Sequence, residues 1–414
     1  MFRLGVKRNN TRITSRHHSI VSWEPGQVRV AVIEMDGGTA QILGVAAAPI
    51  RALGADGLPD VDTWAAGCDE ALTQAEDMTV RFCGRKLVPD WVTMSVAPEV
   101  MRGYPIAVRR ERRDADSGVT SEDLNTLLRL GYRTAQDEMG APAKEAGEDL
   151  VFGSVAEIIL DDQTVLDPLG LHGRELQLRL NFYLLSLQWI RALEVVSDRL
   201  GLKLQSIVPL QAAYASPLVE AASLLIVIDA DHTTVGLVRR GRLEWSVIAH
   251  SGASDVTAMA AQALAVQGKQ VEALMAAYRA GKLQQDVELQ LARAFWTELK
   301  RWMRTLAEAI GTAGRGVTFP HRIFVVDSTR NLPEAAPSLE TPFWEGLLHF
   351  ERCPEVASLE SSAIRNVLDL TARANGPDYL AVRSLAHLAA QLYASEESLD
   401  CVMVDTIRWR TPRG

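Results

Sequence analysis

Cysteine and long apolar runs are the two features that this sequence has least of. Its 414 residues include only 4 cysteines, which lie far apart and show no paired Cys or His spacing. Such spacing is what a disulfide framework or a zinc site requires. The longest apolar run, Leu224–Ile228, has the length of a strand, whereas a membrane-spanning helix needs about 20 residues. We therefore expect neither a disulfide scaffold, a zinc module nor a membrane-spanning protein, and the expected location is the cytoplasm.

Basic residues are also fewer than acidic ones. The chain has 43 Lys and Arg against 52 Asp and Glu, a formal net charge of -9, which argues against binding to nucleic acid. Residues 1–18 are the exception, because they hold basic residues and no acidic one. We expect a basic flexible tail there, and its charge leaves peripheral contact with the inner face of the cell membrane open. The length and the 47% of hydrophobic residues predict two lobes with full cores.

The apolar pattern repeats along the chain. Turns at Pro25-Gly26 and at 36–38 separate three short runs rich in β-branched residues, and a similar trio of runs covers 223–249. This echo predicts two related lobes of an α/β fold. The other expected elements are strands at 91–96, 151–160, 175–183, 204–208 and 322–326, helices at 62–76, 120–139 and 186–200 and in the region up to 310, and loops at 109–116 and 140–149.

Several short motifs occur in an order that resembles one family. The string DPLGLHG (Asp167–Gly173) is the most specific, and segments 42–45, 119–123, 227–229 and 271–274 support it. In this order the motifs resemble the bacterial cell-division family FtsA from about Ile20 to Tyr393. The resemblance implies the two-lobed actin-like fold that actin, Hsp70 and sugar kinases share, with a small inserted β-α-β module, called SHS2, in place of one actin subdomain.

The resemblance also implies a domain plan. Lobe 1 is expected at 19–90 and 185–221, interrupted by the SHS2-like module at 91–184. Lobe 2 is expected at 222–375, followed by a C-terminal helix at 376–400 that returns to lobe 1, and by a tail at 401–414. The apolar run from Cys401 is expected to be a strand or a docked segment, not the membrane-binding amphipathic helix of FtsA chains.

The first phosphate-binding loop of the family falls on the segment that begins at Glu24. The family pattern is acidic-x-Gly-Thr-x-Lys, and the sequence reads Glu-Pro-Gly-Gln-Val-Arg. The resemblance places Glu24 near the metal ion, Gly26 and Gln27 near phosphate, and Arg29 in place of the lysine. Glycine lets the backbone approach a phosphate closely, so this loop keeps the means to bind one.

The second phosphate-binding loop departs further from the family. The pattern Asp-x-Gly-Gly-Gly-Thr-x-Asp is kept at Asp229 and Thr234, but Asp231, His232 and Thr233 replace its three glycines. Their side chains stand where phosphate would meet bare backbone. One negative charge about 4 Å from a phosphate charge costs about 4 kcal/mol at an effective dielectric of about 20. We therefore predict a degenerate site and a pseudo-ATPase.

The adenosine side of the site is altered as well. Glu272 matches the acidic residue that the family places at the ribose, but the lysine three positions later is Met275. A Gly-Gly loop is expected after the strand at 322–326, and the sequence has Asp327–Arg330 there. The sequence indicates no catalytic residue and no separate metal site. If Mg-ATP binds at all, the candidate contacts are Glu24, Gly26, Gln27, Arg29, Asp229, Thr233, Thr234 and Glu272.

Other notable residues have ordinary interpretations. His232 is expected at the surface or in a local hydrogen bond. The run Arg109–Arg113 is expected in a solvated loop, which also offers a docking surface. Trp302 and its aromatic neighbours are expected in the core, and His387 in a structural role.

Three functions remain open from the sequence. The first is an FtsA-like scaffold of cell division that binds the tubulin-like protein FtsZ, or another division protein, and self-associates into filaments. The second is a working ATP-binding switch of cell division. The third is an adaptor similar to the pilus-assembly protein PilM, which shares the fold and binds a short peptide of a membrane partner. The altered loops favour an interaction scaffold over the ATP switch.

Overall fold

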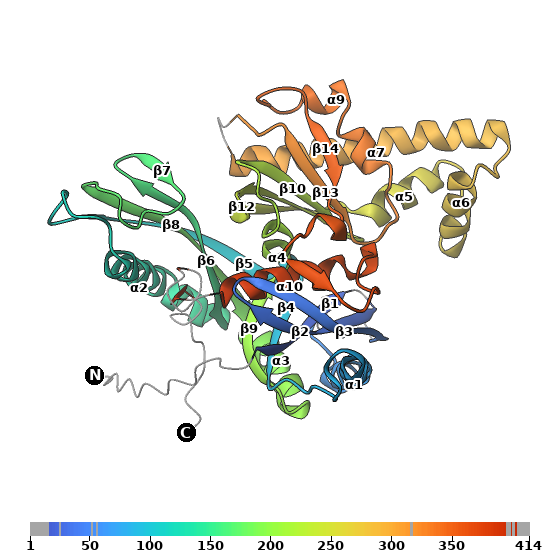
Figure 1. The fold of residues 1–414 in the computed structure, drawn as a ribbon. Coiled ribbons are helices and arrows are strands. Elements are labelled where there is room, and N and C mark those ends of the chain that lie inside the picture. Colours follow the sequence, from blue (N-terminus) through green and yellow to red (C-terminus); the bar gives the residue numbers. More distant parts are fainter. Residues whose placement is uncertain are drawn as a thin grey trace.

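The protein consists of two lobes, each built on its own sheet, and a smaller module with a third sheet (Figure 1). Among the described helices, every one is too short or too polar to cross a membrane. The expected basic tail up to residue 15 and most of the expected C-terminal tail lie outside the described residues. The computed structural model describes residues 16–24, 26–50, 53–54, 57–314, 318–394, 399 and 402–403.

Lobe 1 is built on a six-stranded sheet. Its first three strands are joined by tight turns and pair antiparallel, and Gly26, Gly37 and Gly38 supply the positive φ that such turns favour. The first strand also pairs in parallel with β4, which pairs with β9. In spatial order the strands are β15 (Val367–Asp369), β3 (Thr39–Pro49), β2 (Gln27–Asp36), β1 (His17–Glu24), β4 (Trp91–Val96) and β9 (Lys203–Pro209).

Helix α1 (Val61–Cys83) packs against β2 and β3. The sequence offers Asp60 or Asp62 as the cap of its N-terminus, and in the structure Asp60 is the cap. Gly44 on β3 permits the close approach, because a Cβ there would lie 1.8 Å from the Ala75 carbonyl oxygen. At the end of β1, Trp23 stacks on Trp64 of α1 with ring centroids 3.9 Å apart. The other helices of the lobe are α3 (Leu187–Arg199), α4 (Leu210–Ala215) and α10 (Leu380–Leu392).

Lobe 2 repeats the plan of lobe 1, as the sequence echo predicted. Its first three strands pair antiparallel, and the first of them, β10, pairs in parallel with β13. Both lobes also contain the same loop: the carboxylates of Asp327 and Asp369 each accept hydrogen bonds from the N–H groups two and five residues later. In spatial order the strands are β12 (Arg242–Ala249), β11 (Thr233–Arg239), β10 (Ser223–Ile228), β13 (Arg322–Asp327) and β14 (Glu355–Ser358). The helices are α5 (Ala253–Gln262), α6 (Lys269–Arg279), α7 (Gln285–Ala313), α8 (Ala335–Ser338) and α9 (Pro342–Glu345).

The module is inserted between β4 and α3. Thr120 and Asp123 form the capping box that the sequence predicted at the start of its helix. The module has its own apolar core, in which Met403 is fully buried, with Leu399 and Val402 packed beside it. These contacts agree with the docked segment expected near the C-terminus. The elements are β5 (Met101–Glu111), α2 (Ser121–Ala146), β6 (Glu148–Leu160), β7 (Gln163–Val165) and β8 (Glu175–Ser186), with the strands in the spatial order β5, β8, β6, β7.

The module contacts both lobes. Strand β6 lies against β9 of lobe 1 and against β12 of lobe 2. The side-chain amide of Asn181 donates hydrogen bonds to the carbonyls of Leu243 and Glu244, at 2.5 and 2.8 Å. Arg242 donates to the carbonyl of Val155 at 3.1 Å. The module therefore contacts the first lobe at β9 and the second at β12.

Two sheet assignments differ from the expected boundaries. Strand β4 was expected in the module, but it pairs with β1 and β9 and so belongs to lobe 1. The chain was expected in lobe 2 up to residue 375, but β15 pairs with β3 of lobe 1. The sheet to which a buried strand belongs depends on the strands that lie beside it in the folded chain. The local sequence of the strand does not specify those neighbours.

Two expected loops belong to regular elements. Arg109 and Arg110 lie on β5, an edge strand on which charged side chains face solvent. Helix α2 continues through the stretch expected as a loop from residue 140, because Ala143 packs in the module core. It ends at Gly147, which has the left-handed conformation typical of a helix C-terminus.

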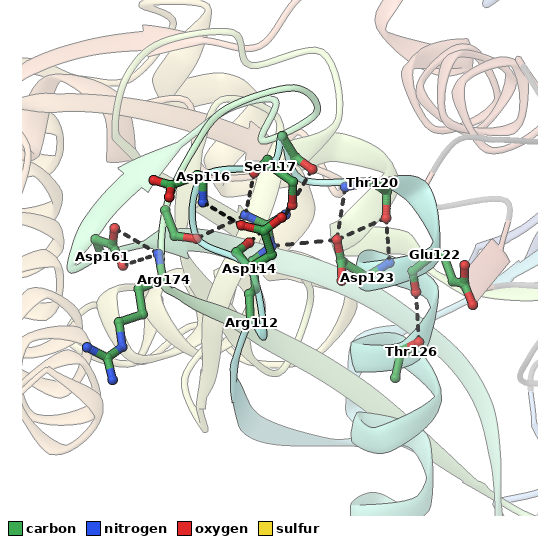
Figure 2. Close-up of polar contacts among 12 residues, drawn as sticks. Arg112, Asp114, Asp116, Ser117, Thr120, Glu122, Asp123, Thr126, Asp161 and Arg174 are labelled. Carbon is green, nitrogen blue, oxygen red and sulfur yellow. Dashed lines mark hydrogen bonds and ion pairs between the residues drawn. The ribbon is translucent and has the colours of Figure 1, made fainter.

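The DPLGLHG string closes the tip of the module, where Figure 2 shows the polar contacts. Arg112 donates hydrogen bonds to the carbonyls of Ser117, Gly118 and Gly173. A Cβ on Gly118 would lie 2.9 Å from the Cα of Gly170, so the two turns meet this closely only because residue 118 is glycine. Arg112 is thus a structural residue and not part of the expected solvated loop, and the most specific motif of the sequence shapes the module.

Candidate functional site

The two expected phosphate-binding loops lie at the boundary between the lobes. The first is the turn between β1 and β2, and the second joins β10 to β11. Ser328, which follows β13, links them: it lines the same cavity as Glu24, and its hydroxyl donates a hydrogen bond to the carboxylate of Asp229. The structure therefore brings together the two loops and the end of β13, as an actin-like site requires.

In the first loop the basic side chain is already bound by acidic ones. Arg29 is buried and forms ion pairs with Glu24 and, at 3.3 Å, with Asp378, which precedes α10. With its amide oxygen facing Arg29, Gln27 accepts a further hydrogen bond at 2.7 Å. Burial lowers the pKa of the Arg29 guanidinium, and the Asp378 charge opposes that effect. The group expected to bind phosphate is consequently occupied by the protein's own side chains.

In the second loop the side chain of His232 fills the space that three glycines would leave open. It is buried, and its Nε2 lies 3.2 Å from a Glu99 oxygen and 3.3 Å from an Asp229 oxygen. Its Nδ1 lies 2.7 Å from an oxygen of Asp231. Burial alone would lower the pKa of His232, but contacts with these three carboxylates outweigh it and raise the pKa to about 11. His232 is therefore an imidazolium cation at neutral pH.

This arrangement corrects the expectation for His232. It is a local hydrogen-bond partner, as predicted, but it is buried, not at the surface, and it also reaches Glu99 in lobe 1. Glu99 was not among the candidate residues. One signal could have found it, because Glu99 follows the carboxyl end of the buried strand β4, and ligand-binding groups gather at that end of parallel strands.

The two threonines of the second loop do not face an open site. The Thr233 hydroxyl donates to the carbonyl of Ser251 at 2.7 Å and accepts from the indole N–H of Trp302 at 3.0 Å. The Thr234 side chain is fully buried in β11. Trp302 itself lies in the lobe 2 core, as the sequence predicted.

Backbone donors near the second loop are also used internally. The N–H groups of Ala253 and Ser254, at the start of α5, donate to the carbonyls of Asp229 and Ala230 at 2.9 and 2.8 Å. Free N–H groups at a helix start are what binds a phosphate in many proteins. Here these two donors hold the loop itself.

The adenosine side offers no matching contact. Glu272 is exposed on α6 and does not line the cavity that Glu24 lines, whereas Met275 is buried in the lobe 2 core. After β13, Asp327 binds backbone N–H groups of its own loop, and Arg330 forms an ion pair with Asp378 of lobe 1. Glu272 is thus not part of the cavity wall that Glu24 and Ser328 form.

The residues present do not fit Mg-ATP. The phosphate cradle, that is, the space that the two phosphate-binding loops would leave for phosphate, is filled by His232. The guanidinium of Arg29 is bound by Glu24 and Asp378, and the N–H groups at the start of α5 already donate to the second loop. Among the described residues, no group of three His, Cys, Asp or Glu side chains has the geometry to hold a metal ion. What the arrangement does instead is join the lobes through two ion pairs, His232 with Glu99 and Arg330 with Asp378.

Comparison with one solved structure supports the fold. No family model matches the sequence, and no curated protein does. Among solved structures, the chain is similar to that of the PilM-PilN type IV pilus biogenesis complex, with a TM-score of 0.59 and 14% identity over 90% of this chain and 98% of that one. It is also similar to the ethanolamine utilization protein EutJ from Carboxydothermus hydrogenoformans (TM-score 0.44, 12% identity, 89% of each chain). A third similar structure is the cytoplasmic domain of EpsL from Vibrio cholerae, with a TM-score of 0.33 and 11% identity over 89% of this chain and 94% of that one. The chain has the two-lobed actin-like fold that its sequence predicted, and none of these matches shows membership of the FtsA family.

Proposed function

We propose that this protein is an actin-fold adaptor that binds protein partners without a nucleotide switch, in a role like that of PilM in its complex with PilN. The filled phosphate cradle is the observation that carries this proposal. A nucleotide switches a two-lobed protein only if it binds one arrangement of the lobes better than another. Here the ion pairs of His232 with Glu99 and of Arg330 with Asp378 already link the lobes without a nucleotide.

The module supports the same role. Because it contacts both lobes through β6, it further restrains their relative motion. A restrained body is suited to present fixed surfaces to partners, since little conformational entropy is lost on binding. Under this proposal a membrane-protein partner would bring the chain to the cytoplasmic face of the membrane.

An FtsA-like scaffold that binds FtsZ and forms filaments is the second candidate. The order of motifs from Ile20 to Tyr393 favours it. The most specific of them, DPLGLHG, shapes the tip of the module, so it is expected in any chain that carries this module, whatever its partner. The PilM-like role is therefore preferred.

Titration with Mg-ATP in a calorimeter tests the proposal. We expect a dissociation constant weaker than about 1 mM, and a value at or below about 10 μM would contradict it. Replacing Asp231, His232 and Thr233 together with glycine should raise the affinity for Mg-ATP if side chains are what closes the cradle. The thermal midpoint of the variant, measured alongside, shows whether it still folds.

The partner is tested separately by binding assays with purified proteins of the same organism. The PilM-like role predicts binding to the cytoplasmic segment of a PilN-like membrane protein and no binding to FtsZ. Binding to FtsZ alone would favour the second candidate. Binding to neither would count against both.

A further inference from the structure

A cavity of about 380 Å³ lies between the lobes, next to the filled phosphate cradle. Its size is in the range of small-molecule sites. Lobe 1 contributes Glu24, Tyr214 and the start of α10, and lobe 2 contributes the ends of β13 and β14. None of the interactions described above for the cradle fills this space.

One buried polar atom on its wall lacks a partner. The Glu24 carboxylate oxygen Oε1 is buried without a hydrogen-bond partner, whereas the other oxygen pairs with Arg29. Tyr214, which is only 3% exposed, lines the same cavity. Buried polar groups in native proteins are nearly always hydrogen-bonded, so an unpaired carboxylate oxygen on the cavity wall indicates a place for a ligand.

The charges on the wall favour a cation. Three carboxylates line the cavity, those of Glu24, Asp327 and Glu360, against one guanidinium, that of Arg330. Arg330 is paired with Asp378 and Glu24 with Arg29, whereas Asp327 accepts hydrogen bonds from neutral backbone N–H groups, so the wall keeps an excess of negative charge. An anionic ligand such as a triphosphate would be repelled there. The rest of the lining is mainly apolar and includes Val326, Leu332, Leu359 and Leu380.

We propose that this cavity binds an organic cation: an amine, amidine or guanidine on an apolar body. Its N–H groups donate to Glu24 Oε1 and to the Tyr214 oxygen, and its body lies on the apolar lining. The cation belongs either to a free small molecule or to a lysine or arginine side chain of a bound partner. This inference goes beyond the adaptor role, because it assigns a ligand to the interface between the lobes. The ligand is a cation, whereas the nucleotide bound by actin-like proteins is an anion.

Benzamidine is a suitable probe, and benzamide is its neutral counterpart of the same shape. We expect the wild-type protein to bind benzamidine at least tenfold more tightly than benzamide in calorimetry. Glu24→Gln and Tyr214→Phe should each weaken benzamidine at least fivefold. Tyr214→Phe leaves the pair of Glu24 with Arg29 intact, so it remains informative if Glu24→Gln folds poorly. Glu308→Gln, at an exposed position of α7, is the matched control and should bind as the wild type does.

Equal binding of benzamide and benzamidine would overturn the proposal, as would unchanged binding in Tyr214→Phe. Agmatine and an acetylated Gly-Gly-Arg-Gly-Gly amide distinguish the two sources of the cation. Tighter binding of agmatine supports a free small molecule, and tighter binding of the peptide supports a partner side chain. Mg-ATP binding is measured independently, so loss of this proposal leaves the adaptor role standing.

Discussion

At the second phosphate-binding loop, a buried histidine with three carboxylate neighbours replaces a glycine. His232 neutralises part of the charge of Asp229, Asp231 and Glu99, which would otherwise repel one another. The contact with Glu99 crosses from lobe 2 to lobe 1. His232 therefore does more than occupy the position of a glycine. It supplies the positive charge that offsets the repulsion among the three carboxylates.

His232→Gln should lower the free energy of unfolding by about 2 kcal/mol near pH 6.5, because three carboxylates lose their cation. Urea unfolding of both proteins measures the difference. The folded pKa of about 11 lies above the unfolded value of 6.5, so the stabilisation is complete below pH 6.5 and disappears as the pH rises towards 11.

The difference between wild type and variant should accordingly shrink from pH 6.5 to pH 10. His349→Gln, an exposed histidine of lobe 2, is the control and should change stability by less than about 0.5 kcal/mol. A difference that stays constant with pH would show that His232 acts by packing and not by charge.

At the scale of single elements, the close contact of α1 with β3 depends on the absence of a Cβ at Gly44. Gly44→Ala should destabilise the protein by about 3 kcal/mol, because its Cβ would meet the Ala75 carbonyl at 1.8 Å and the helix backbone must move. The thermal midpoint of unfolding measures this change.

Gly140→Ala is the matched control for that substitution. Gly140 lies within α2, and an added Cβ would meet nothing within 4 Å. It should stabilise the protein by about 0.5 to 1 kcal/mol, through the loss of glycine flexibility in the unfolded chain. Similar effects of the two substitutions would mean that α1 adapts more easily than the close contact indicates.

The elements that the sequence predicted well are those with local signals. The two hairpins of lobe 1, the cap at Asp60 and the capping box at Thr120 are each specified by a few adjacent residues. Strands β7, β14 and β15 have three or four residues each and were missed. A strand so short is defined by the strand it pairs with, and that partner is distant in the sequence.

The candidate site shows the same limit. Both loops were located from their residues, and so was the loss of their glycines. The side chains that close the site, Glu99 and Asp378, come from segments far from either loop, and only the folded chain brings them there. Glu272 shows the converse, because it matches a family position but does not line the cavity beside the first loop.

For the whole molecule, two buried neutral histidines predict sensitivity to acid. Burial lowers the pKa of His18 to about 3 and that of His387 to about 4. Both lie below the unfolded value of 6.5, so the unfolded chain takes up protons first, and stability falls as the pH drops from 6.5 towards these values. At pH 5 each histidine should cost about 2 kcal/mol.

Urea unfolding at pH 6.5, 5.5 and 5.0 measures this loss in a range where the contribution of His232 is already complete. The pH dependence should be reduced in His18→Gln and in His387→Gln. Stability that stays level or rises between pH 6.5 and pH 5 would contradict the assignment of neutral histidines.

The stack of Trp23 on Trp64 gives the molecule a built-in optical reporter. Trp23 immediately precedes Glu24, the residue shared by the first loop and the interlobe cavity, and Trp189 meets Trp64 edge-on. Any occupant that shifts Glu24 should disturb this indole pair and change its emission and near-ultraviolet circular dichroism. Unlabelled protein can therefore be screened for ligands by its own fluorescence.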